Sequence, residues 1–239
     1  MHIRSNLALA IAALLAAALA SPACAAGFKL HPSGFGAHSY CSWKAGEGLP
    51  DNTGNENQAL YFQKMTSTPT FAAGVAVFKG FEGMTVSQLT ALEFKWGMDG
   101  WCGAGAPRFN LRVDPDGAGP APPVTYFIGC ASMVPGPITT APNGRMFQTK
   151  TAAAPFPTAF PGPPPPSGTI VSLAIVFDEG NDVGPGFVYL DDIRVGTTSG
   201  DHTWKSASDN GDGDTSTANT ADIATVEALL GEPVTVLFR

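Results

Sequence analysis

The sequence GFVYLDDIRVG, residues Gly186–Gly196, decides the fold class of this 239-residue chain. It is rich in β-branched and aromatic residues and is bounded by glycines, which predicts a β-strand. Because side chains alternate across a strand, one face is expected to hold Phe187, Tyr189, Asp191, Ile193 and Val195. A carboxylate in an apolar row is costly to bury unless it is satisfied. Asp191 therefore requires loop amides, an arginine or a calcium ion as its partner.

Similar strand signals recur along the chain, separated by clusters of Gly, Pro, Asn and Asp. The nine predicted strands are Ser39–Trp43, Ala59–Lys64, Gly74–Phe78, Ala91–Trp96, Arg108–Val113, Val124–Gly129, Arg145–Thr149, Thr169–Phe177 and Phe187–Val195. Helical periodicity is nearly absent, and no repeat of about 20–50 residues is found. The pattern predicts an all-β fold, an antiparallel β-sandwich.

Two proline-rich segments and the C-terminal region depart from this pattern. Gly117–Pro123 is predicted to be a hairpin loop. Pro155–Pro166 is predicted to be an extended, polyproline-II-like loop, because proline donates no hydrogen bond to a sheet. The sandwich domain is expected to span residues 26–197. Residues 198–239 are expected to form an acidic linker, a short C-terminal helix over Thr220–Leu230 and an edge strand over Val234–Phe238.

The N-terminus has the features of a secretory signal peptide over residues 1–25. One positive charge at Arg4 precedes an uncharged apolar run and then small residues, with Ala23-Cys24-Ala25 as the cleavage site. A lipidated Cys24 is the alternative, but Ser21 stands where lipoprotein signals usually have a large aliphatic residue. We therefore expect a secreted or periplasmic protein without a membrane span.

The composition excludes one class of partner. The formal net charge is −7, and only 14% of residues are charged, with Lys and Arg scattered along the chain. Such a chain repels polyanions, so nucleic acid is not expected as a partner.

Three cysteines remain after cleavage at the predicted site: Cys41, Cys102 and Cys130. In an oxidising compartment two of them are expected to pair. Cys102 and Cys130 flank a predicted hairpin, and we expect them to form the disulfide, with Cys41 left as a buried thiol. Pairing of Cys41 with Cys102 or with Cys130 remains open at this point.

The strand over Arg108–Val113 offers a candidate binding face. If Phe109, Leu111 and Val113 point inward, the other face carries Arg108, Asn110 and Arg112, near Trp101 in the preceding glycine-rich loop. Aromatic rings cover the apolar face of a pyranose, and planar amide and guanidinium groups pair with adjacent hydroxyls. These four residues are the predicted ligand-binding residues; a solvated face beside a structural tryptophan is the alternative.

A second candidate site consists of acids near the last strand. Asp178 and Asp182 lie in the turn before it and are expected to join Asp191 around a structural calcium ion, because calcium prefers hard oxygen ligands. The acidic run Asp209–Asp214 does not fit the register of an EF-hand loop and is interpreted as linker.

Motifs for catalysis are scarce. The sequence has no His-Glu-x-x-His zinc signature, no Gly-x-Ser-x-Gly nucleophile elbow and no phosphate-binding glycine loop, so no catalytic residue is assigned. A carboxylate pair for glycoside hydrolysis leaves no local signature, and a small glycosidase or lyase therefore remains an alternative.

The strand rhythm from Ala59 to Gly196 and the closing strand Phe187–Val195 resemble secreted bacterial β-jelly-roll modules of the carbohydrate-binding type. The resemblance implies a jelly-roll-like sandwich. It also implies a structural calcium ion near Asp191, the position that matches an acid of the last strand in such modules. We expect a secreted, non-catalytic protein that binds a polysaccharide, a glycan or another extracellular surface. An exported structural or adhesive protein is a further alternative.

Overall fold

The computed structural model describes residues 27–210, apart from residues 37, 52–56, 67–71, 118 and 179–185. The predicted signal peptide, the helix over Thr220–Leu230 and the strand over Val234–Phe238 lie outside the described residues, as does Asp182. No helix among the described residues is long and apolar enough to cross a membrane.

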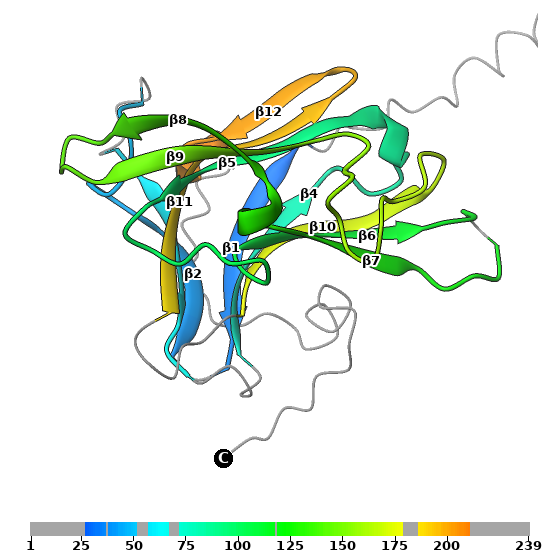
Figure 1. Ribbon diagram of the computed structural model, residues 1–239, viewed down its shortest axis with the longest axis horizontal. Coiled ribbons are helices and arrows are strands. Elements are labelled where there is room, and N and C mark those ends of the chain that lie inside the picture. The colour runs from blue at the N-terminus through cyan, green and yellow to red at the C-terminus, as the bar shows by residue number, and fades with distance from the viewer. Residues whose placement is uncertain are drawn as a thin grey trace, which may run out of the picture.

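Two antiparallel sheets pack face to face as a sandwich, which confirms the predicted fold class (Figure 1). The first sheet has the order β1 (Lys29–Phe35), β4 (Ala73–Lys79), β10 (Thr169–Phe177), β6 (Arg108–Asp114), β7 (Val124–Gly129). The second has the order β2 (Ser39–Lys44), β3 (Ala59–Lys64), β11 (Gly186–Thr197), β5 (Leu89–Gly97), β9 (Met146–Ala153), β8 (Val134–Thr140), and β12 (Gly200–Trp204) pairs with β11. The chain passes repeatedly from one sheet to the other, as in a jelly roll.

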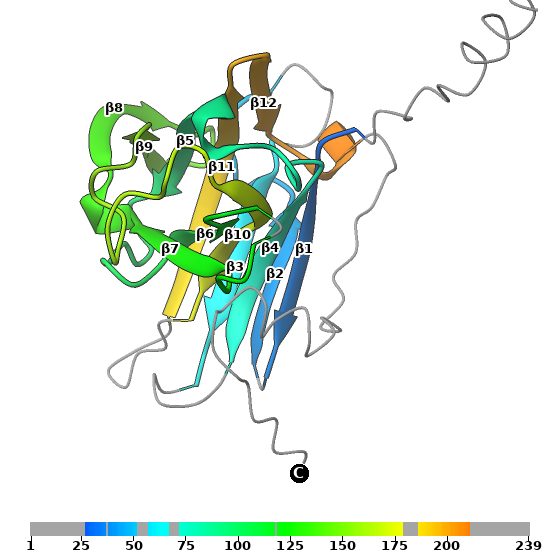
Figure 2. The same cartoon turned by 90° about the vertical axis from the view of Figure 1, so that its right-hand side faces the viewer.

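Figure 2 shows the same two-sheet arrangement from the side. The core lies between the two sheets and is dominated by large apolar side chains with no exposed surface. Most strands contribute alternate residues to it, as period-2 patterning requires, whereas β8 has no buried residue. Its fully buried aromatic residues include Phe62, Phe78, Phe94, Phe109 and Phe177. Phe109 stacks between Phe78 and Phe94 at ring-centroid distances of 6.1 and 5.5 Å, so the middle of the sandwich is an aromatic layer.

All nine predicted strands are present, and three further strands were missed. Pro32 and Gly34 interrupt the pattern of β1, and Pro135 and Pro137 interrupt that of β8. Both are edge strands, the position where proline is tolerated because one row of N–H groups has no partner. The third, β12, is short and pairs only with β11. Sequence patterning therefore found every inner strand and the edge strands β2 and β7, and it missed the proline-containing edge strands β1 and β8 and the short strand β12.

The face predicted for the decisive strand is wrong beyond Leu190. Val188 and Leu190 point into the core, and a β-bulge at Asp191–Asp192 then shifts the register, so that Ile193 and Val195 also point into the core. Asp192 has a positive φ of 44°. A bulge inserts one extra residue and reverses the alternation after it. The predicted row therefore divides, with Phe187, Tyr189 and Asp191 on the outer face and Ile193 and Val195 on the inner face.

The sandwich continues past the boundary predicted at residue 197. β12 pairs with β11 from Ile193 to Thr197, and Trp204 at its end is 2% exposed, with its ring 5.2 Å from that of Phe78. A short 3₁₀ helix, η4 (Ala207–Asn210), follows. Burial of a tryptophan makes this hairpin part of the core, so residues 198–210 belong to the sandwich and not to a linker.

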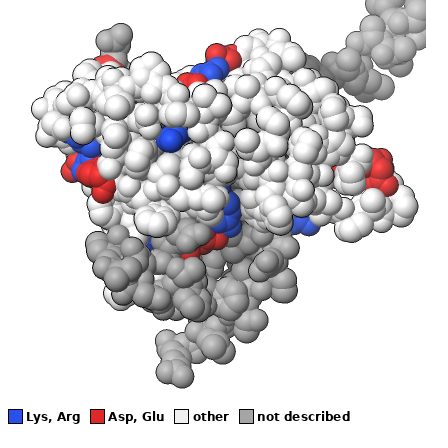
Figure 3. Space-filling view, viewed as in Figure 1, with Lys and Arg blue, Asp and Glu red and all other residues white. Residues whose placement is uncertain are grey.

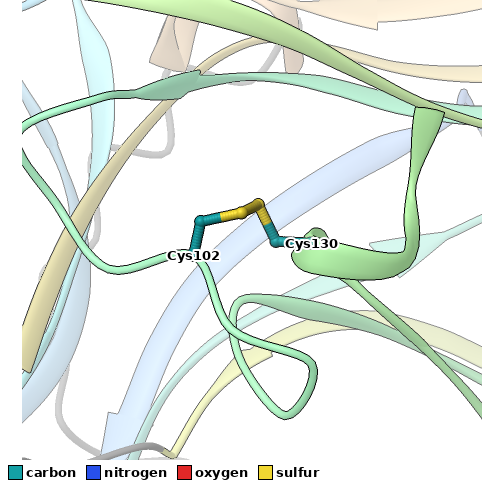
Figure 4. The surroundings of a disulfide bond; sticks show 2 residues. All are labelled: Cys102 and Cys130. Atoms are coloured by element: carbon teal, nitrogen blue, oxygen red, sulfur yellow. A yellow bond between two sulfur atoms is a disulfide. The ribbon is translucent and has the colours of Figure 1, made fainter. Parts of the chain in front are cut away.

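The predicted disulfide between Cys102 and Cys130 is present, and Cys41 is a buried free thiol. The bond joins the loop after β5 to the 3₁₀ helix η3 (Cys130–Ser132), as Figure 4 shows. It encloses the β6–β7 hairpin. Burial raises the pKa of the Cys41 thiol well above its ordinary value, so that thiol stays protonated and unreactive.

Removing the disulfide is expected to destabilise the protein substantially. The bond closes a loop over a sequence separation of 28 residues, and on the chain-entropy model such a closure contributes about 3 kcal/mol. Urea unfolding of a Cys102→Ala/Cys130→Ala variant should show a loss of that size. A reductant should lower the wild-type midpoint toward that of the variant and leave the variant unchanged; equal midpoints for both proteins would contradict the prediction.

Candidate functional site

The predicted polar face of β6 exists. Phe109, Leu111 and Val113 are fully buried in the core, so Arg108, Asn110 and Arg112 lie together on the outer face of the first sheet. Arg108 donates from Nε to Asn110 Oδ1 at 2.9 Å, which confirms that these two side chains meet. Asn110 is only 1% exposed, however, so it supports Arg108 from below.

The protein itself holds the Arg108 guanidinium. Nη1 and Nη2 donate to the two carboxylate oxygens of Asp178 at 2.6 Å each, and Nη1 also donates to the carbonyl of Gly105. A bidentate arginine–carboxylate pair fixes both the position and the plane of the guanidinium. Because the Asp178 charge offsets the Arg108 charge, this part of the face is close to electrically neutral.

A groove of about 480 Å³ lies beside Arg108. Its described lining consists of Ala104, Gly105, Arg108, Phe127, Gly129, Ser132, Thr158 and Phe160. The Arg108 guanidinium lies 5.2 Å from the centroid of the Phe127 ring, and Phe160 is 69% exposed. The groove therefore combines two phenyl rings with a fixed planar cation and two hydroxyl groups.

The proline-rich loop supplies Phe160 by pairing with the edge of the first sheet. The Phe127 amide donates to the Phe160 carbonyl at 2.8 Å, and the Phe160 amide donates to the Phe127 carbonyl at 2.9 Å. Successive turns form around Phe156, which is fully buried, so the loop is anchored in the core and is not extended as predicted. This pairing also covers part of the exposed edge of β7.

Gly129 sets the depth of the groove. A Cβ atom at this position would overlap the carbonyl oxygen of Ala104, so only glycine allows the loop before β6 to pack this closely against the end of β7. The disulfide and the hydrogen bond from the Ala131 amide to the Gly103 carbonyl, 3.0 Å long, hold the same loop in place.

Charged side chains are few around this part of the molecule. The described lining of the groove contains Arg108 but no Asp, Glu or His. Figure 3 shows that the face in view, over β7, β8 and β9, is largely uncharged. Contacts made there will depend mainly on apolar surface and neutral hydrogen-bonding groups.

The structure does not bring Trp101 into this arrangement. Its ring is 47% exposed and folds over Gly103, and its amide donates to the carbonyl of Phe187 in β11 at 2.8 Å. Trp101 is not among the residues described as lining the groove. Of the four predicted ligand-binding residues, only Arg108 lines it.

Sequence reasoning missed the two aromatic residues of the groove. Phe127 was detectable, because alternation along Val124–Gly129 places it on the outer face of β7. Phe160 had no such signal, since it lies in a proline-rich segment interpreted as a plain loop. Its position depends on a backbone pairing with a strand far away in the sequence.

Asp191 is satisfied by amides, one of the three partners expected for it. Its carboxylate is 1% exposed and accepts from the Leu49 amide at 2.6 Å and from the Asp192 amide at 2.6 Å. Gly48 allows this approach, because a Cβ atom there would overlap the carbonyl of Gln58. Burial nevertheless raises the pKa of Asp191 to about 7, an effect that the two amide donors and Lys95 only partly oppose.

The calcium site predicted at Asp178, Asp182 and Asp191 stays a prediction. Asp178 binds Arg108, Asp191 binds two backbone amides, and Asp182 lies outside the described residues. Within the described part of the chain, no group of three or more His, Cys, Asp or Glu side chains is placed to hold a metal ion.

No model of a protein family, no curated protein and no solved structure matches this chain. The fold and the geometry described above therefore carry the functional argument.

Asp191 should make the stability of the protein depend on pH. A carboxyl whose pKa is raised on folding contributes stability that is complete below its unfolded pKa and is lost as the pH rises through its folded pKa. With a folded pKa of about 7, the free energy of unfolding should fall by a few kcal/mol, on the order of 1.4 per pKa unit, between about pH 4 and pH 7. Asp191→Asn imitates the protonated form and should remove this fall.

The measurement is urea unfolding of both proteins from pH 4.5 to pH 8. Asp116→Asn is the matched control, because Asp116 lies in the exposed turn after β6 and its substitution should preserve the wild-type slope. Parallel pH profiles for wild type and Asp191→Asn would refute the assignment.

Proposed function

We propose that this protein is an exported, non-catalytic carbohydrate-binding protein and that it binds a neutral sugar in the groove beside Arg108. The observation that carries the proposal is the exposed Phe160 ring, which shares one groove with Phe127 and a guanidinium fixed by Asp178.

The chemistry of the groove suits a pyranose. One face of a sugar ring presents C–H groups that pack against aromatic rings, while its hydroxyls require hydrogen-bonding groups at the edge. Phe127 and Phe160 supply the apolar contact, and Ser132 and Thr158 supply hydroxyl groups. The volume falls in the range of about 300–1,000 Å³ that is typical of small-molecule sites.

The charge balance favours a neutral sugar over an acidic one in this groove. Arg108 is the single cation in the described lining, and Asp178 pairs with both of its terminal nitrogens. An acidic sugar would compete with Asp178 for the guanidinium and lose its own hydration in doing so.

Binding is a better account of this groove than hydrolysis. Most glycosidases need two carboxyl groups on either side of the scissile bond. No Asp or Glu occurs among the described lining residues, and the nearby Asp178 is ion-paired with Arg108. Export is supported by the signal-peptide pattern of residues 1–25 and by the disulfide.

The test is binding of the mature chain to a neutral glycan array and to insoluble neutral polysaccharides. Phe160→Ala should weaken the binding about tenfold, equivalent to about 1.4 kcal/mol, because it removes the most exposed ring of the groove. Met146→Ala is the control, since Met146 is 49% exposed and lies on β9 in the other sheet. Absence of binding to every neutral glycan, or equal affinity of wild type and Phe160→Ala, would refute the proposal.

A further inference from the structure

Four aromatic rings form a continuous patch on the outer face of the second sheet. Tyr40 lies on β2, Tyr61 on β3, and Phe187 and Tyr189 on β11. The centroid distances from Tyr61 are 5.8 Å to Tyr40, 4.7 Å to Tyr189 and 6.2 Å to Phe187, and those of Phe187 and Tyr189 lie 6.2 Å apart. We call these four residues the aromatic patch.

Strand register explains the patch. Tyr61 and Tyr189 are direct partners in the antiparallel pair of β3 and β11, so their side chains lie side by side. The residues next to them along the strands, Phe62 and Val188, are fully buried in the core. The four rings are therefore on the outer face by alternation, and each is partly exposed.

Lys44 adds a cation above the patch, and it has no anionic partner among the described residues. Its ammonium nitrogen lies 5.4 Å from the Tyr40 centroid and 5.9 Å from the Tyr61 centroid. Among the described residues, no carboxylate forms an ion pair with Lys44. A cation over two aromatic rings is stabilised, and its charge stays available to an anion.

Arg145 is a second cation on the same face, and it differs from Lys44 because it forms ion pairs with carboxylates. Its guanidinium lies 3.7 Å from the Tyr189 centroid and forms ion pairs with Glu47 and with Asp99. These two carboxylates raise the pKa of Arg145. The two basic groups on the patch thus differ, since Arg145 is paired with two carboxylates and Lys44 with none of the described ones.

We propose that the aromatic patch and Lys44 form a second binding site, which takes an acidic glycan built from uronic acid units. The sugar rings lie flat on the tyrosines, and the carboxylate on C5 of one ring pairs with the Lys44 ammonium. Charge complementarity with the Lys44 ammonium favours the acidic sugar, and this local attraction acts against the repulsion that a chain of net charge −7 exerts on anions in general. This inference does not depend on the neutral-sugar groove, which lies on the other sheet.

The flatness of the patch also favours an extended glycan of several sugar units over a single sugar enclosed in a pocket. Its rings come from three neighbouring strands of one sheet, so they present a surface and not a cavity. A purely structural role for the rings accounts for cross-strand packing, at about 0.2–1 kcal/mol for each pair. It does not account for the position of Lys44, which lies over two of the rings and forms no ion pair with a carboxylate in the described part of the chain.

The experiment measures binding of the mature chain to polygalacturonate by affinity electrophoresis and calorimetry, with the fully methyl-esterified polymer as the neutral probe. We expect binding to polygalacturonate that weakens with added salt and, in the Phe160→Ala background, in which the neutral-sugar groove is impaired, at least tenfold weaker binding to the ester. Lys44→Gln should weaken binding to polygalacturonate about tenfold and reduce the difference between the two polymers. Tyr61→Leu should weaken binding to both polymers.

Matched controls separate this site from the groove and from general electrostatics. Lys79→Gln removes an exposed lysine on β4 of the other sheet and should leave binding unchanged. Phe160→Ala should also leave it unchanged, so that failure of the neutral-sugar proposal and failure of this one remain distinguishable. Thermal melts verify that each variant is folded.

Three outcomes would overturn the inference. The first is no binding to polygalacturonate, and the second is equal binding of polygalacturonate by wild type and Lys44→Gln. The last is binding to mixed vesicles of phosphatidylserine and phosphatidylcholine that is as tight as binding to polygalacturonate. The last would show that the patch binds anionic surfaces without recognising a sugar ring.

Discussion

Burial of the Asp191 carboxylate at the bulge of β11 is the constraint on which the rest of the structure depends. β11 pairs with β5 along one side, while its partner on the other side changes from β3, up to Leu190, to β12, from Ile193 onward. The bulge lies at this change. It keeps apolar residues on the core side both before and after it, so one strand serves two partners without turning its apolar side chains to solvent. The amides of Leu49 and Asp192 offset part of the cost of burying a carboxylate there.

The same bulge decides what the outer face of the second sheet presents. Before it, Phe187 and Tyr189 point outward beside Tyr61, and beyond Tyr189 the cluster of Leu49, Ala59, Ala141 and Phe147 covers the face. The segment that carries Leu49 is held there by its hydrogen bond to Asp191. The aromatic patch therefore ends where the bulge begins, and a backbone irregularity in one strand defines the edge of this patch.

The sequence predicted features that depend on local pattern and missed those that depend on distant pairing. Alternation located nine strands, which include every inner strand and the edge strands β2 and β7, and hairpin spacing identified the Cys102–Cys130 disulfide. It placed Ile193 and Val195 on the wrong face, because both faces of the strand are apolar before Asp191, so strict alternation was continued through the bulge at Asp191–Asp192. It identified Arg108 but not Phe160, whose position requires the proline-rich loop to pair with Phe127. Trp101 had the expected chemistry in a loop that runs along β11 instead.

Two sites on opposite sheets would act together on a polysaccharide that carries both neutral and acidic units. When one site holds the chain, the second meets its units at an effective concentration set by the intervening length of polymer, which can raise overall avidity well above either single affinity. Their electrostatics make the two sites unlike. Asp178 neutralises Arg108 in the groove, whereas Lys44 keeps its charge over the aromatic patch. One protein molecule would therefore bind a neutral unit and an acidic unit of the same polysaccharide chain or of two chains. Each site would distinguish neutral from acidic sugars by whether its cation is already paired with a carboxylate of the protein.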